Sequence, residues 1–356
     1  MSLTKEYTLS IEKVETSRIS NVDFSNLTFG TTFTDHMFEC DFKNGTWQNP
    51  SIKPYGPLSI YPASKVFHYG QAVFEGMKAY KDAEGSIFLF RPIENLKRIN
   101  ISSKRLAIPE FPEALFFEAL ETLLQLDKAW AQQGVGNSLY IRPFVIANEN
   151  CVSASPSNEY KFLIIISPVS AYYSGELKVV VAEKFSRSAN GGVGYAKAAG
   201  NYAAQFYPTN LAKEKGFQQV IWTDADSHQY LEEAGTMNVF FRINDTLITA
   251  PTSDRILDGV TRKSVIALAQ RDGVKVEERK LTVTELVIAA NDGSLKEIFG
   301  SGTAAVISPV KAFSFKEVMY ELPILTESYA SRFKKELTDI QYNLADDPFG
   351  WRYKVV

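Results

Sequence analysis

The sequence has few cysteines and histidines and no long apolar run. Its two cysteines, Cys40 and Cys151, lie far apart and form no Cys-x-x-Cys pair, which argues against a disulfide framework or a zinc site. With only three histidines, a histidine-rich metal centre is not expected either, and we expect no metal. The densest apolar run, 162–166, is far below the ~18 residues that span a bilayer. Residues 1–20 contain no apolar secretory segment, so we expect a cytoplasmic protein with no membrane span.

The chain also lacks an excess of charge of either sign. Lysine plus arginine number 38 and aspartate plus glutamate 41, which gives a formal net charge of −3. This slight acidity argues against a nucleic-acid partner, because such proteins carry a basic excess. Hydrophobic residues make up 45% and charged residues 22% of the chain, proportions that exclude a disordered protein. The composition predicts a globular protein.

The length of 356 residues favours two domains. Strand and helix signals alternate along the chain, which predicts an α/β or α+β fold. A short, polar, turn-prone segment near the middle is the expected interdomain loop, over 168–175. We therefore predict an N-terminal domain over 1–167 and a C-terminal domain over 176–356.

Periodic patterns predict individual elements. In the first half we expect strands over 87–90, 139–147 and 162–167, and helices over 93–106 and 113–133. Gly134 and Gly136 follow the second helix as a stop signal. In the second half, signals for helices and strands cover 177–183, 202–213, 218–223, 239–243, 262–270, 282–289 and 325–341.

Two glycine-rich stretches, 191–200 and 299–304, are candidates for a ligand site. Glycine lets a backbone approach a ligand closely and offers N–H groups to anions. The first stretch is neither a Walker A loop nor a dinucleotide fingerprint, because Lys197 is flanked by alanines and occupies the place of the third glycine. Small neighbours would let a flat ring pack against this lysine, and desolvation would make it nucleophilic. Composition alone favours the simpler interpretation, a flexible loop with a solvated lysine.

Two further segments carry weak signals of the same kind. Glu233 stands before the apolar strand 239–241, where a carboxylate either caps a turn or pairs with a cation. Segment 258–264 precedes an apolar helix whose free N–H groups could bind an anion, although an ordinary capped helix is commoner. Together with Lys197, these segments supply the parts that pyridoxal phosphate requires: a Schiff-base lysine, an acid for the pyridine nitrogen and a phosphate cup.

At these residues the chain resembles the branched-chain amino acid aminotransferases, which are fold-type IV pyridoxal-phosphate enzymes. The resemblance implies a two-domain fold-type IV α/β (α+β) architecture with the cofactor between the domains, and a homodimer. It also implies that segment 150–154, which matches loosely, lines the neighbouring subunit's site. The matching motifs run nearly end to end and in family order: 29–37, 68–79, 90–98, 139–143, 148–149, 191–202, 233–238, 259–262 and 300–304.

The resemblance assigns cofactor roles residue by residue. Lys197 is the Schiff-base lysine and the general base of the proton transfer. Glu233 binds the protonated pyridine nitrogen, and Tyr202 binds the phenolate oxygen of the ring. A guanidinium and a helix start suit a phosphate dianion. The remaining implied cofactor-binding residues are Arg98, Thr236, Val260, Thr261 and Thr303.

The implied substrates are L-leucine, L-isoleucine and L-valine, with glutamate or 2-oxoglutarate as the partner in a ping-pong reaction. Arg142 and the hydroxyl of Tyr69 would bind the distal carboxylate of the dicarboxylic substrate. The turn Thr303–Ala304 would offer N–H groups to the α-carboxylate. The implied aromatic wall for the aliphatic side chain consists of Phe29, Tyr69, Phe74, Tyr140 and Tyr172.

Some alternatives remain open. D-amino-acid aminotransferases and aminodeoxychorismate lyase share the lysine and the glutamate, although segments 69–74 and 140–142 favour the branched-chain enzyme. From a different class, the glycine loops could serve a non-catalytic protein that binds a phosphate ligand. Ala305 and Ser308 stand where vertebrate relatives carry a Cys-x-x-Cys pair, so a thiol switch at that position is excluded.

Overall fold

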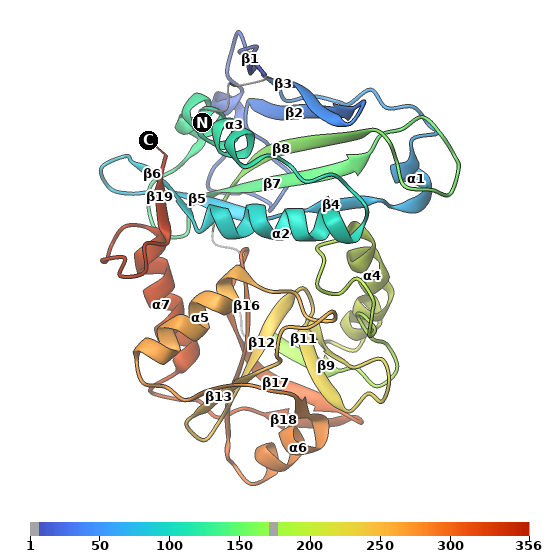
Figure 1. Ribbon diagram of the computed structural model, residues 1–356. Coiled ribbons are helices and arrows are strands. Elements are labelled where there is room, and N and C mark those ends of the chain that lie inside the picture. Colours follow the sequence, from blue (N-terminus) through green and yellow to red (C-terminus); the bar gives the residue numbers. More distant parts are fainter. Residues whose placement is uncertain (1–6, 171–176, 356) are drawn as a thin grey trace, which may run out of the picture. The chain divides into compact units, whose positions relative to one another are not determined.

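The computed structural model describes residues 7–170 and 177–355. By contacts, the chain forms two compact units, Met1–Tyr172 with Ile340–Val356, and Tyr173–Asp339. Each unit has its own sheet and hydrophobic core, and each is described separately below (Figure 1).

In its described residues, the first unit contains a nine-stranded sheet in the order β1-β3-β2-β8-β7-β5-β6-β19, with β4 paired to β7. Most neighbours are antiparallel, and β1 with β3 is a parallel pair. The strands are β1 (Ser10–Ile11), β2 (His36–Lys43), β3 (Thr46–Pro54), β4 (Ala72–Phe74), β5 (Met77–Lys81), β6 (Ile87–Phe90), β7 (Ser138–Ala147), β8 (Tyr160–Val169) and β19 (Arg352–Lys354).

Alternation along β7 separates the core of the first unit from a polar face. Leu139, Ile141 and Val145 lie in the core cluster, which also contains the apolar side chains of α2 (Pro92–Arg105) and α3 (Glu113–Leu126). Tyr140 and Arg142 point to the opposite face, because successive strand residues alternate. The face of the sheet opposite this core therefore carries the candidate substrate residues Tyr140 and Arg142.

The helix predicted over 113–133 ends earlier than expected, at Leu126. The next residue, Asp127, is buried and accepts a hydrogen bond from the backbone N–H of His36 at 3.0 Å, while the imidazole Nδ1 of His36 lies 2.6 Å from the same carboxylate. A short helical turn, Lys128–Trp130, follows and buries Trp130. The helix thus ends where Asp127 binds His36, a residue 91 positions away in the sequence.

In its described residues, the second unit contains a ten-stranded sheet in the order β14-β13-β12-β16-β17-β9-β10-β11-β15, with β18 paired to β17. β9 lies parallel to both β10 and β17. The strands are β9 (Leu177–Val181), β10 (Gln219–Thr223), β11 (Tyr230–Ala234), β12 (Met237–Ile243), β13 (Thr246–Thr249), β14 (Val276–Glu278), β15 (Leu281–Thr282), β16 (Leu295–Gly302), β17 (Val306–Phe315) and β18 (Val318–Glu321).

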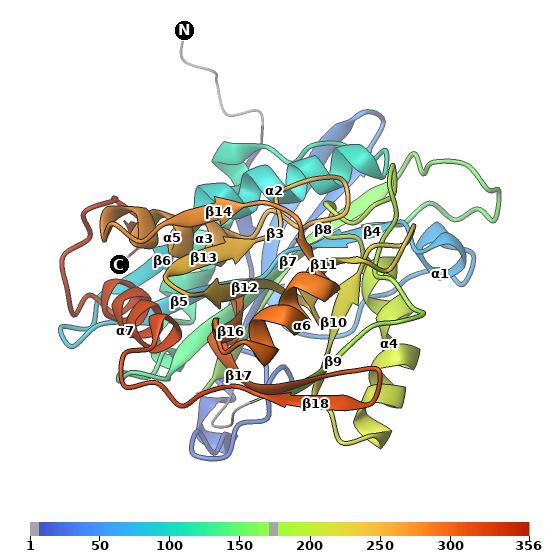
Figure 2. The same cartoon turned by 90° about the horizontal axis from the view of Figure 1, so that it is seen from below.

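The helices of the second unit cover different parts of its sheet. α4 (Ala199–Glu214) contacts β10, α5 (Val260–Arg271) contacts β14 and β16, and α6 (Val283–Asn291) contacts β15 and β16 (Figure 2). α7 (Tyr329–Gln341) begins where Glu297 accepts the backbone N–H groups of Tyr329 and Ala330. Within the described residues, no helix is long and apolar enough to cross a membrane.

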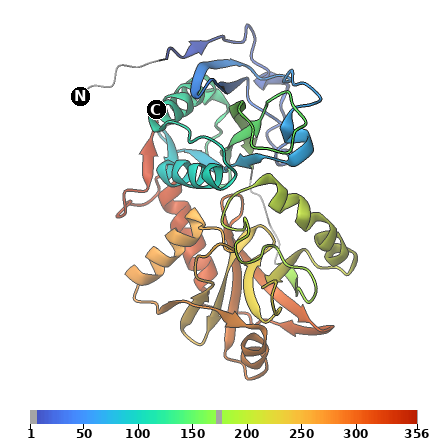
Figure 3. The same cartoon turned by 45° about the vertical axis from the view of Figure 1, so that its right-hand side comes forward.

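The end of the chain belongs to the first unit by contacts. Strand β19 pairs antiparallel with β6, so residues 340–356 group with Met1–Tyr172, whereas the sequence places them in a C-terminal domain over 176–356 (Figure 3). Strand β8 extends to Val169, and most of the predicted interdomain loop, 168–175, lies outside the described residues. The domain boundaries stay a prediction.

Candidate active site

In the second unit, Lys197 lies just before α4 and beside an aromatic hydroxyl of that helix. Its Nζ donates to the hydroxyl of Tyr202 at 2.7 Å and lies 5.2 Å from the centroid of the same ring. The lysine is partly buried. Its neighbours Ala196 and Ala198 are buried, which holds the backbone at the start of the helix. The structure therefore brings together two predicted site residues, Lys197 and Tyr202.

Glu233 is a buried carboxylate at the end of β11, and three groups hold it in place. Arg187 Nε lies 2.5 Å from its Oε2, with both side chains about 5% exposed or less. Its Oε1 accepts hydrogen bonds from Asn238 Nδ2 at 2.9 Å and from the backbone N–H of Leu257 at 3.1 Å. Glu233 and Asn238 are directly paired across the β11–β12 hairpin. This network fixes the direction in which the carboxylate points.

Burial raises the pKa of Glu233, and the positive charge of Arg187 is the strongest influence in the opposite direction. The neighbouring Glu232 is buried too, with Arg255 Nε 2.7 Å from its Oε1, and burial raises its pKa to about 7. The two ion pairs are linked, because Arg187 donates through Nη2 to the backbone carbonyl of Arg255 at 2.5 Å. Two carboxylates and two guanidinium groups thus form one buried cluster.

The start of α5 lies near this cluster. Asn238 Nδ2 also donates to the carbonyl of Leu257 at 2.8 Å, two residues before the helix cap Gly259. A Cβ on Gly259 would lie 2.0 Å from Asn238 Oδ1, so glycine is needed here for Asn238 to keep this position. Val260 and Thr261, the predicted phosphate ligands, form the first helical turn and are buried.

The other predicted residues of the second unit lie at two turns. Thr303 and Ala304 directly follow β16, whose last residues pair with the start of β12. Thr236 occupies the tight turn between β11 and β12 and is exposed. The structure thus places most of the predicted cofactor residues around one end of strands β11, β12 and β16.

In the first unit, four predicted substrate residues form a cluster. Arg142 donates through Nη2 to the hydroxyl of Tyr140 at 3.0 Å, and its guanidinium lies 4.6 Å from the ring centroid of Phe74. Phe29 packs edge-on against Tyr140 with centroids 5.0 Å apart. These four residues form a partly exposed surface that combines aromatic rings with the positive charge of Arg142.

A glycine sets the position of Tyr140. A Cβ on Gly76 would lie 2.1 Å from the Tyr140 hydroxyl, so the ring can occupy this place only because the residue is glycine. Lys78 on β5 pairs directly with Tyr140 on the same sheet face and is buried, which lowers the pKa of its amine to about 8. Lys78 was not among the predicted site residues.

Tyr69 and Arg98, which were also predicted as site residues of this unit, have hydrogen-bond partners outside the Arg142 cluster. The hydroxyl of Tyr69 donates to the carbonyl of Val152, and its ring is exposed. Arg98 binds the fully buried Glu75 through Nε at 2.6 Å and Nη2 at 2.9 Å. Tyr172 lies outside the described residues.

Most of the residues missed from the sequence have partners that are distant in the chain. Arg187 precedes Glu233 by 46 positions and has no local pattern around it. Asn238 and Glu75 lie within motifs that carry the resemblance, so their positions were marked without a role. Lys78 could have been found as a charged residue between the apolar residues Met77 and Ala79 of strand β5.

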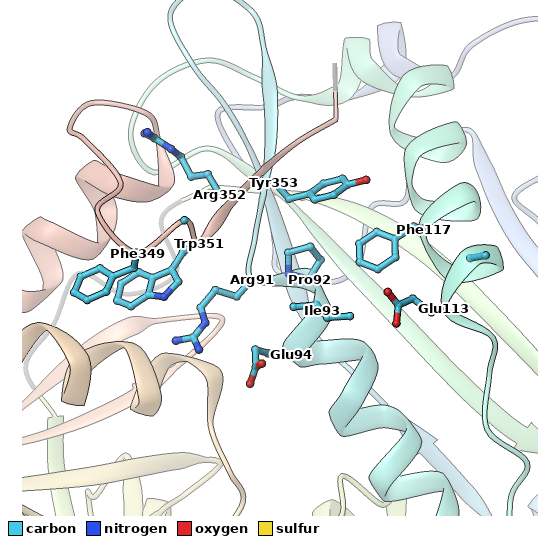
Figure 4. Close-up of a pocket in the computed structure, with 12 residues that line it drawn as sticks. Arg91, Pro92, Ile93, Glu94, Glu113, Phe117, Phe349, Trp351, Arg352 and Tyr353 are labelled. Atoms are coloured by element: carbon cyan, nitrogen blue, oxygen red, sulfur yellow. The ribbon is translucent and has the colours of Figure 1, made fainter.

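A pocket of the first unit lies elsewhere. It is formed by the starts of α2 and α3 and by segment 349–353, where the rings of Phe349 and Trp351 stack at 4.2 Å (Figure 4). Its lining in the described part of the chain includes none of the predicted site residues. The candidate site is therefore defined by side-chain geometry rather than by this pocket.

Comparisons with known proteins place the chain in a class. The family model described as amino-transferase class IV matches residues 72–313. The chain is 43% identical over 358 residues to branched-chain-amino-acid aminotransferase 2 of Bacillus subtilis, covering 99% of this chain and 98% of that protein. It is 40% identical to the branched-chain-amino-acid aminotransferase of Mycolicibacterium smegmatis, covering 97% of each. The chain therefore belongs to the branched-chain-amino-acid aminotransferase family of class IV.

Solved structures support the fold. The branched-chain aminotransferase of Escherichia coli aligns with a TM-score of 0.74 at 24% identity, covering 90% of this chain and 99% of that one. The enzyme of the archaeon Thermoproteus uzoniensis aligns with a TM-score of 0.73 at 22% identity, covering 90% and 100%. The prediction of a fold-type IV aminotransferase architecture is confirmed.

Proposed function

We propose that this chain transfers the amino group of L-leucine, L-isoleucine or L-valine to 2-oxoglutarate, reversibly, by a ping-pong mechanism with pyridoxal phosphate. The observation that carries the proposal is the pairing of Lys197 with Tyr202 in the same unit as the buried Glu233–Arg187 pair. The curated relatives named above bear the name of this activity over nearly the whole chain.

The residues present fit pyridoxal phosphate. A partly buried amine and a phenol 2.7 Å apart suit its aldehyde and ring oxygen, and a buried carboxylate suits its ring nitrogen. The first turn of α5 has no side-chain cap, and its N–H groups suit a phosphate, with Thr261 and Thr303 as further donors. We propose that Arg98 and Thr236 complete this set.

The cofactor, when bound, supplies an electron sink for the pair left at the substrate Cα. Lys197 takes the proton from Cα and returns it, as a general base and acid. Tyr202 holds the lysine by hydrogen bonding. Glu233 would hold the proton of the ring nitrogen, and the charge of Arg187 opposes the rise that burial causes in the pKa of Glu233.

The cluster of the first unit suits a site with two kinds of substrate. Phe29, Phe74 and Tyr140 offer apolar surface to a branched side chain. Arg142 offers a guanidinium to the distal carboxylate of glutamate or 2-oxoglutarate, and its buried Nε has no hydrogen-bond partner in the described part of the chain. We propose that Tyr69 assists Arg142, that Tyr172 extends the aromatic wall, and that Ala304 offers its N–H to the α-carboxylate.

We also propose a homodimer, located in the cytoplasm, with no nucleic-acid or membrane partner. Three large apolar side chains are strongly exposed around α1 (Lys65–Tyr69) and the loop after β7: Tyr61 at 67%, Phe67 at 63% and Val152 at 60%. A second copy of the chain would cover this surface. Light scattering of the purified protein tests this proposal, and a monomer at micromolar concentration would contradict it.

The experiment that tests the function is an absorbance spectrum during sequential addition of substrates. With pyridoxal phosphate bound, L-leucine should remove the visible band, and 2-oxoglutarate should restore it. Lys197→Ala should abolish this cycle and lower turnover by at least about 1,000-fold. Lys213→Ala, at the exposed end of α4, is the matched control and should behave as the unmodified protein.

Two results would contradict the proposal. A preference for D-alanine or for aminodeoxychorismate over L-leucine would point to another enzyme of the same fold. A failure to develop any visible band after addition of pyridoxal phosphate would favour a non-catalytic protein that binds a phosphate ligand.

A further inference from the structure

Ser301, near the end of β16, is a buried polar residue that the predicted site leaves out. Its side chain is only 2% exposed, and its hydroxyl has no hydrogen-bond partner within residues 7–170 and 177–355. A buried hydroxyl without a partner is unfavourable by ~1–3 kcal/mol, so native proteins almost always supply one. This hydroxyl therefore needs a partner other than the described protein groups.

The strand register shows where the hydroxyl lies. Ser301 pairs directly with Asn238 on β12, and Asn238 pairs directly with Glu233 on β11. Directly paired residues of antiparallel strands project from the same face, with neighbouring strands ~4.8 Å apart. Glu233, Asn238 and Ser301 therefore form a polar row across three adjacent strands.

The opposite face of the sheet is apolar. Val239, Phe241 and Ile298 lie in the core cluster of the second unit, and a Cβ on Gly300 would lie 2.7 Å from Met237 Cε. The face with the polar row continues instead into the stacked rings of Phe240 and Phe299, 5.1 Å apart. Ser301 thus shares a face with Glu233, away from this core.

The row connects the two ends of the proposed cofactor site. Glu233 marks the end that faces the ring nitrogen, and Thr303, two residues after Ser301, belongs to the phosphate end. α5, whose first turn carries Val260 and Thr261, contacts β16. A ligand that reaches from Glu233 to Thr303 passes along the face that Ser301 occupies.

We infer that Ser301 is a cofactor-binding residue, whose hydroxyl donates a hydrogen bond to the bound phosphorylated pyridine. This inference rests on the proposed function. It adds to the site a buried hydroxyl for which the described part of the chain supplies no partner. The alternative occupant is a trapped water, in which case the serine has no effect on cofactor affinity.

The test compares Ser301→Ala with the unmodified protein in two measurements. Equilibrium dialysis of cofactor-free protein against pyridoxal phosphate should give a Kd raised about ten-fold, the effect of one lost hydrogen bond. Thermal unfolding of the cofactor-free protein should show an unchanged or higher Tm, because the substitution removes an unsatisfied group. A merely structural serine would instead lower that Tm.

Ser308→Ala is the matched control. Ser308 is also buried, on the adjacent strand β17, but it pairs with Gly300 and so points to the apolar face. Its substitution should leave the Kd unchanged. An unchanged Kd in Ser301→Ala, or an equal rise in both variants, would overturn the inference.

If the proposed function is wrong, a different set of results is expected. In that case the unmodified protein would not bind pyridoxal phosphate, or would bind it and show no spectral cycle with L-leucine and 2-oxoglutarate. If the unmodified protein completes the cycle and Ser301→Ala binds the cofactor equally well, only the role of Ser301 is wrong.

Discussion

Glu233 in the second unit and Arg142 in the first unit are held in opposite ways. In the second unit, Glu233 and Arg187 form a buried pair that is at most 5% exposed. In the first unit, Arg142 is partly exposed, and its guanidinium makes cation–π contacts with the rings of Phe74 and Tyr140. A buried pair keeps one geometry, whereas a partly exposed guanidinium against aromatic rings can meet either an apolar group or an anion.

This contrast indicates a division of tasks. The second unit would set the electronic state of the cofactor, which both half-reactions use. The first unit would select between aliphatic and dicarboxylic substrates, which differ between the half-reactions. Substitutions at Glu233 and Arg187 should therefore slow both half-reactions, and substitution of Arg142 should affect one.

The largest effect is expected for Arg187→Met. Without the guanidinium, the strongest influence that opposes burial is lost and the pKa of Glu233 rises further, which favours the protonated carboxyl. We expect kcat to fall on the order of 100-fold with L-leucine and with glutamate alike. Steady-state kinetics of both reactions provides the measurement.

Arg187→Lys should recover part of this loss, since it restores the charge. Arg279→Met is the control, because Arg279 binds Glu285 at a partly exposed position of the same unit. A folded Arg187→Met variant with kcat within two-fold of the unmodified protein would break the proposed contrast.

A smaller effect is expected for Glu232→Gln, which tests the buried cluster through pH. The folded-state pKa of Glu232 is raised from 4.5 to about 7, so its protonated form is favoured by folding. The stability that this group contributes is present below about pH 4.5 and is lost as the pH rises through 7. The unfolding free energy of the unmodified protein should fall across that window by about 1–3 kcal/mol from this group.

Urea denaturation at several pH values measures this slope. Glu232→Gln should flatten it, and the control Glu278→Gln should not, because the Glu278 side chain is 45% exposed beside Arg262. Equal slopes in the two variants would show that the cluster does not hold a proton near neutral pH.

Local parts of this site were predictable from the sequence, and distant contacts were not. Lys197 and Tyr202 lie within one loop–helix motif, so their proximity could be expected. Strands β7 and β8 follow apolar patterns in the sequence, so these strands could be predicted as well. The pairs Arg187–Glu233 and His36–Asp127 join residues 46 and 91 positions apart, and no periodicity marks them.

The glycines had a further structural role. The sequence suggested that glycines bring the backbone close to a ligand. In the structure, Gly76, Gly259 and Gly300 make room for Tyr140, Asn238 and Met237, so they also position neighbouring side chains of the same unit. Such contacts depend on tertiary packing, which composition and spacing do not reveal.

The division of tasks is tested most directly by the two half-reactions of Arg142→Leu, measured separately by stopped-flow absorbance. We expect the step with L-leucine to keep its rate within about two-fold. The step with 2-oxoglutarate should slow at least about 30-fold at subsaturating substrate, because a charge-assisted pair is worth about 2 kcal/mol or more. Equal slowing of both half-reactions would contradict the account.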